Sequence, residues 1–67
     1  MNSDDRIDIE RALDTLTQKQ RAVFVMIIMG DKTQAEVARL MGVTQPTVHK
    51  HLHVAIRKVR AYRDDRL

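Results

Sequence analysis

Two short helix patterns separated by only three residues, Gly42-Val43-Thr44, constrain the fold of this chain more than any other feature. The first pattern opens with Thr33, and Glu36 three residues later completes a capping box, in which each side chain pairs with the backbone N–H of the other residue. The second pattern has Pro46 in its first turn, where the backbone needs no donor. Helices joined this tightly must cross steeply, as in a helix-turn-helix motif.

The apolar residues of these two patterns predict which side of the second helix is buried. Ala38 falls where the helices cross, and Gly42 can adopt the positive φ that the turn requires. The angle between the helices is expected to be filled by Val37, Met41, Val43 and Val48. The opposite side then projects polar and basic side chains: Gln45, Thr47, His49, Lys50 and His53. We predict that these residues read bases in the DNA major groove, which admits one helix; the alternative is a plain helical hairpin.

Start and stop signals divide the rest of the chain into two more helices. A first helix is capped by Ser3 or Asp4, and its apolar positions recur at helical spacing: Ile9, Ala12, Leu13 and Leu16. Thr17 caps a second helix that runs to about Met29 and stops at Gly30. The helix after Thr44 meets no breaker and runs for about 18 residues. No segment alternates with period two, so we predict an all-α fold: one four-helix domain over residues 1–67, with a C-terminal helix-turn-helix and a long recognition helix.

The second helix is apolar around most of its circumference. Val23, Phe24 and Ile27 can face the core together, which leaves a second apolar stripe made of Ala22, Val25, Met26 and Met29. Either the first and fourth helices cover both sides, or this stripe is a surface for a partner, which would be a polymerase subunit or a second copy of the chain.

Charge is distributed unevenly along the chain. The formal net charge is +3, but Met1 to Leu16 carries five acidic and two basic residues, a balance of −3, and the remainder carries four acidic and ten basic residues, a balance of +6. The stretch from Thr44 to Arg63 holds five bases, three histidines and no acid. One basic end on a small domain is the electrostatic footprint of a protein that binds a polyanion.

Three stretches of the chain carry a resemblance to a known family. They are LDTLTQKQRAVF (Leu13 to Phe24), TQAEVARLMGVTQPTVHKHLH (Thr33 to His53) and AIRKVR (Ala55 to Arg60). Together they resemble region 4 of bacterial sigma factors, the domain that reads the promoter −35 element. The chain is similar, less fully, to the DNA-binding output domain of LuxR-type regulators, which share the Leu16-Thr17 pair and the phrase from Thr47 to Leu52. The residue spacing from Gly30 to Glu36 suits the sigma-type loop better.

The resemblance to region 4 implies a set of contacts and partners. Residues near DNA phosphates would be Lys19, Arg21, Lys32, Thr33 and Arg57. Docking on RNA polymerase core is also implied. We expect that the chain is not a complete sigma factor, because the region that melts the −10 element has no counterpart here. Two alternatives remain open: a LuxR-type regulator that dimerises on a palindrome, and a protein-binding adaptor with the same fold.

Several other functions are not expected. The chain has no cysteine, so no disulfide can form, and a reducing cytoplasm fits. The longest apolar run, Val23 to Met29, is too short to cross a membrane. We predict no cofactor and no metal, because His49 and His53 lack a third ligand and Lys50 lies between them. No glycine loop, cysteine nucleophile or convergent pair of carboxylates suggests an enzyme.

Overall fold

The computed structural model describes residues 3–65, and these residues form helices joined by short turns. The elements are α1 (Ser3–Leu13), α2 (Gln18–Phe24), the π-helical turn η1 (Val25–Met29), α3 (Gln34–Met41) and α4 (Gln45–Asp65). No strand occurs within residues 3–65, which confirms the predicted all-α class. The side chains of Ser3 and Asp4, which were predicted to cap α1, lie outside the described residues. None of the described helices is long and apolar enough to cross a membrane.

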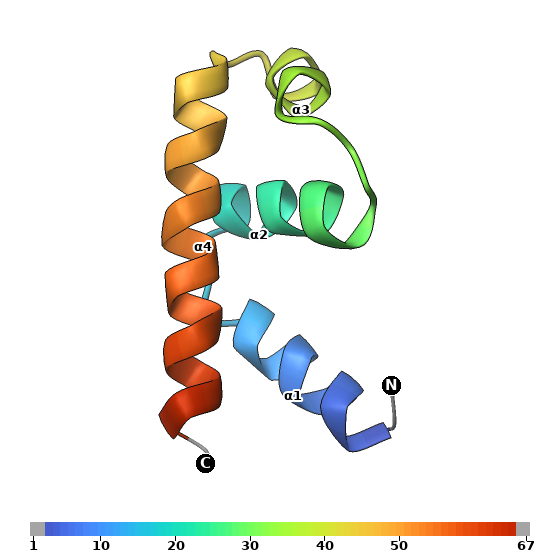
Figure 1. The fold of residues 1–67 in the computed structure, drawn as a ribbon, viewed down its shortest axis with the longest axis vertical. Helices are drawn as coiled ribbons and strands as arrows, with labels where there is room; N and C mark the ends of the chain where they lie inside the picture. Colours follow the sequence, from blue (N-terminus) through green and yellow to red (C-terminus); the bar gives the residue numbers. More distant parts are fainter. Residues whose placement is uncertain (1–2, 66–67) are drawn as a thin grey trace.

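Helix α4 is the element against which the others pack. It has 21 residues, a little longer than predicted, because nothing in its sequence interrupts it before Asp65. Figure 1 shows α2 crossing α4 near its middle, α3 lying near the start of α4, and α1 lying beside its C-terminal half. The recognition helix of the predicted helix-turn-helix is therefore also the scaffold of the domain.

Two apolar clusters hold the helices together. The larger cluster joins α2, α3 and the first half of α4 through Val23, Val37, Ala38, Val48 and Leu52. The second joins α1, α2 and the middle of α4 through Leu13, Leu16, Phe24 and Ala55. Ile56 packs against both clusters. The predicted buried face of α1 is confirmed for Ala12 and Leu13, which are buried, and for Ile9, which packs against the second cluster. Leu16 is buried as expected, but it lies in the turn that follows α1, because the helix ends at Leu13.

The second helix ends differently from the prediction. A continuous helix to Met29 was expected, but the last five residues form a π-helical turn. The helix then stops at Gly30 as predicted, and the Lys32 N–H donates to the Met26 carbonyl oxygen at 3.0 Å. A Cβ added at Gly30 would lie 2.9 Å from that same oxygen, so the turn has no room for a side chain. The left-handed residue of this turn is Asp31, with φ of 56°, and not Gly30.

The outer stripe of the second helix also needs a correction. Met26 was placed in it, but this residue packs with Ile27 against the larger cluster. Both follow the fully buried Val23 by three and four residues, the spacing that keeps side chains on one helical face. Ala22 is half-buried. The exposed apolar residues at this end are Val25, Ile28 and Met29, with exposed fractions of 37%, 49% and 58%. Helices α1 and α4 therefore leave part of this segment uncovered.

Candidate nucleic-acid interface

The start of α3 is fixed by the predicted capping box. The Thr33 hydroxyl oxygen accepts from the Glu36 N–H at 3.1 Å, and the Thr33 N–H donates to Glu36 Oε1 at 3.3 Å. The Thr33 hydroxyl itself lies 3.1 Å from Glu36 Oε1 and donates to it. Thr33 was predicted to contact phosphate, but its side chain and N–H are both used within the cap. The first backbone N–H groups of a helix have no acceptor within the helix. At this end of α3 it is therefore these groups that attract an anion.

The capping box makes the stability of α3 depend on pH. Hydrogen bonds from the Thr33 N–H and hydroxyl, with Lys32 and Arg39 nearby, hold the pKa of the Glu36 carboxyl below its usual value of 4.5. Because its pKa is lower in the folded state, the ionised Glu36 carboxyl stabilises the fold at pH values above its unfolded pKa. This stabilisation is lost as the pH falls through the folded pKa.

We therefore predict that a Glu36→Gln variant loses less stability than the wild type when the pH falls through this acidic range. The amide oxygen of glutamine can accept the hydrogen bond from the Thr33 N–H without carrying a charge, as Gln20 does from the Thr17 N–H at the start of α2. Urea unfolding measured over a series of acidic pH values tests this, with Asp31→Asn as the control, because Asp31 is an exposed carboxylate outside the capping box and asparagine tolerates its positive φ. Identical pH profiles for the wild type and Glu36→Gln would contradict it.

The turn between α3 and α4 has the geometry that the sequence predicted. Gly42 has φ of 68°, in the left-handed region, and the Val43 N–H returns to the Ala38 carbonyl oxygen at 3.0 Å. Ala38 is buried at the crossing. Val37 and Val48 are fully buried, while Met41 and Val43 pack against the same cluster. The two helices are therefore held in a fixed relation, with one side of α4 inside and the other outside.

Four of the five predicted base-reading residues are exposed on the first half of α4: Gln45, His49, Lys50 and His53. Thr47 differs, because it is half-buried and its hydroxyl lies 2.9 Å from the hydroxyl of Thr44. The Thr44 hydroxyl oxygen also accepts from the Thr47 N–H at 3.3 Å, which confirms Thr44 as the cap of α4. Thr47 thus belongs in part to the cap.

The two exposed histidines contact each other, and one of them also contacts a side chain of α3. The ring centroids of His49 and His53 lie 4.2 Å apart, with the planes tilted by 58°. On another side, His49 Nδ1 lies 3.4 Å from the amide nitrogen of Gln34, the first residue of α3. Sequence reasoning missed Gln34, since the contact joins residues 15 positions apart on two helices. The described residues contain no group of three or more histidine, cysteine or carboxylate side chains that could hold a metal.

The predicted phosphate-binding residues are found in different surroundings. Lys19, Lys32 and Arg57 are exposed. Arg21 has its guanidinium 3.8 Å from the Asp14 carboxylate, with both side chains mostly exposed, so this ion pair is weak and breaks easily. Lys58, a cation absent from the prediction, donates to Gln20 Oε1 at 2.9 Å and ties α4 to the start of α2.

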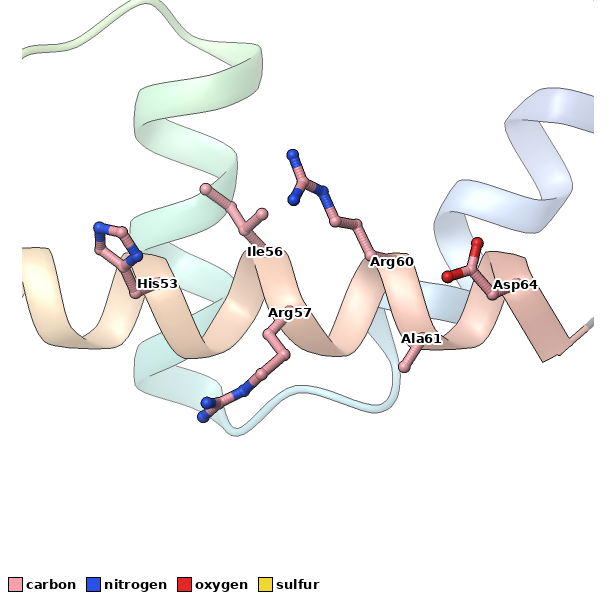
Figure 2. A pocket seen from close by; sticks show the side chains of 6 residues that line it. All are labelled: His53, Ile56, Arg57, Arg60, Ala61 and Asp64. Carbon is pink, nitrogen blue, oxygen red and sulfur yellow. The ribbon is translucent and has the colours of Figure 1, made fainter.

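A pocket of about 470 Å³ continues the basic surface along α4. It is lined by His53, Ile56, Arg57, Arg60, Ala61 and Asp64. Figure 2 shows His53, Ile56 and Arg60 projecting to one side of the helix, and Arg57 to the other. Its cationic side chains place further positive charge directly after the residues that were predicted to read bases.

Comparison with known protein families agrees with this architecture. The model of the family described as sigma-70, region 4 matches residues 6–59, which include all of α2, η1 and α3 and most of α1 and α4. A search of curated proteins and a search of solved structures gave no match. The family is one of DNA-binding helix-turn-helix domains that act in transcription, and it is the first of the two families that the sequence resembled. The chain belongs to the sigma-70 region 4 family.

Proposed function

We propose that this domain reads a −35-like promoter element with the first half of α4 in the major groove, and that it acts by binding, without catalysis. The observation that supports this most is the exposed row formed by Gln45, His49, Lys50 and His53, backed by the buried Val48. Glutamine can pair with adenine, and lysine with guanine. The side chains are thus polar and basic where a groove would lie and apolar where the domain needs its core.

The surrounding cations would set the position of the domain on the duplex. Lys19, Lys32 and Arg57 are exposed and free to reach phosphates, which fix register without reading sequence. Arg21 would have to leave Asp14 to do so, at little cost. The acidic stretch before Leu16 would be repelled by DNA, so we place α1 on the side away from the duplex.

Selection of bound sites from a random duplex library, followed by titration of salt, tests this proposal. One asymmetric motif, with an affinity that falls steeply as salt rises, is expected of a monomer that releases counterions from phosphates. A palindrome with half-sites one helical turn apart would instead indicate a two-fold dimer of the LuxR type. The absence of affinity for any duplex would overturn DNA reading and favour a protein-binding adaptor.

We further propose that the domain docks on RNA polymerase through Val25, Ile28 and Met29. These apolar side chains are 37%, 49% and 58% exposed at one end of the second helix, a pattern typical of a surface that binds protein. A Val25→Glu, Met29→Glu variant should keep its DNA affinity and lose binding to polymerase core. Leu40→Glu is the matched control, because Leu40 is an exposed apolar residue on a different helix. Equal polymerase binding by both variants would contradict this docking surface. If the wild type self-associates and the Val25→Glu, Met29→Glu variant does not, the surface binds a second copy of the chain instead.

A further inference from the structure

Gln34 lies where it can control the chemistry of a base-reading side chain. Its amide nitrogen is 3.4 Å from Nδ1 of His49. A neutral imidazole carries one proton, so one ring nitrogen donates while the other accepts. An amide N–H₂ group only donates. With the amide nitrogen turned toward the ring as it is here, a neutral His49 accepts at Nδ1 and carries its proton on Nε2.

We propose that Gln34 is a positioning residue that selects the Nε2–H form of His49, so that this histidine meets DNA as a hydrogen-bond donor. The inference rests on the proposed function for its consequence in DNA reading, but the tautomer itself is a property of the free protein. Gln34 is the first residue of α3, and the capping box between Thr33 and Glu36 holds that helix end in place. The ring of His53, with its centroid 4.2 Å from that of His49, restrains the imidazole from another direction.

A fixed donor predicts a particular base preference. Guanine presents two acceptors in the major groove, N7 and O6, whereas cytosine presents the donor N4–H₂. His49 with Nε2–H would favour guanine and disfavour cytosine at the position that it meets. With the proton on Nδ1 instead, Nε2 would accept, and the preference would be reversed.

The test is nitrogen NMR of the imidazoles in the full chain at about pH 8.5, well above the ordinary imidazole pKa of about 6.5. The wild type is expected to show the Nε2–H form of His49. Gln34→Met removes the donor and should give a mixture of tautomers. Gln34→Glu replaces the donor by a carboxylate, which only accepts, and should move the proton to Nδ1. Methionine and glutamate both favour helix, so each variant should fold.

Gln18→Met is the matched control, because Gln18 is the first residue of α2 and follows a capping box of the same kind at Thr17. It should leave the His49 spectrum unchanged. An Nδ1–H form in the wild type, or the same tautomer in wild type, Gln34→Met and Gln34→Glu, would overturn the inference. Unfolding of Gln34→Glu would free the His49 ring and would not place its proton on Nδ1. A shift to the Nδ1–H form therefore reports the contact with residue 34 and not a loss of structure.

The consequence for DNA is measured separately. Gln34→Glu should lower the affinity for the guanine-containing site about two- to tenfold relative to the cytosine-containing one, the size of one hydrogen bond. Gln18→Met should keep the wild-type ratio. An unchanged ratio in Gln34→Glu would overturn the base preference. No binding of any duplex by the wild type would overturn the proposed function and the base preference together, while the NMR spectrum still decides the tautomer.

Discussion

Replacing Leu52 by alanine is expected to lower the free energy of unfolding by about 2–5 kcal/mol, the range found when a buried leucine is truncated. Leu52 is buried in the larger cluster together with the fully buried Val23, Val37 and Val48. A domain of this length buries a smaller share of its surface than larger domains do, so its total stability is small. Much of the Leu52→Ala population should be unfolded at room temperature, as measured by urea titration followed by circular dichroism.

The same substitution at Leu40 is the control. Leu40 is 65% exposed on α3, so Leu40→Ala removes a side chain that is largely in contact with water. Its effect should stay within about 0.5 kcal/mol, as is usual for surface positions. Equal losses at the two leucines would mean that the packing of α4 against α2 and α3 described above is wrong.

Replacing Lys50 by alanine is expected to cost about 1–3 kcal/mol of binding to the selected DNA site and to relax the choice of base at one position. Lys50 is exposed and directly follows His49 on the proposed reading face. Binding to unrelated duplexes should change much less. Fluorescence anisotropy on the selected site and on a scrambled duplex of the same composition measures both quantities.

Lys32→Ala provides the contrast, since Lys32 is also exposed but precedes α3 on the side assigned to phosphates. Its loss should weaken binding to both duplexes alike and reduce the slope of affinity against salt by about one. If Lys32→Ala relaxed specificity and Lys50→Ala only lowered the salt slope, the two roles would have to be exchanged.

The parts of the fold that follow local rules were predictable from the sequence. Capping boxes, a glycine with positive φ and helical spacing act within a few residues, so Thr33, Gly42 and the apolar face of α1 were identified correctly. The π-helical turn was not, because apolar spacing over Val25–Met29 does not distinguish a wider turn from an α-helical one. Met26 was misplaced because helical spacing alone allows it on either face: it follows Ala22 by four residues on the outer stripe and Val23 by three on the inner one, where it packs.

The candidate site shows the same division. Exposure on α4 follows from which residues are buried, so the sequence correctly predicted that four of the five residues proposed to read bases are exposed. The involvement of Thr47 in the cap was overlooked, although Thr44 was recognised. The contacts from Gln34 to His49 and from Lys58 to Gln20 join different helices, and only the packed structure brings those side chains together.

The division of the core into two clusters along α4 implies that the domain can open in stages. Among the residues with described side chains, the apolar residues of α1 pack in the second cluster, whereas the helix-turn-helix depends on the first. Amide protons of α1 can therefore exchange with solvent through a local opening that leaves the turn at Gly42 closed, and those around Val48 should exchange only when the whole domain unfolds. Ile56 packs on both clusters, so its contacts couple the opening of one cluster to the stability of the other.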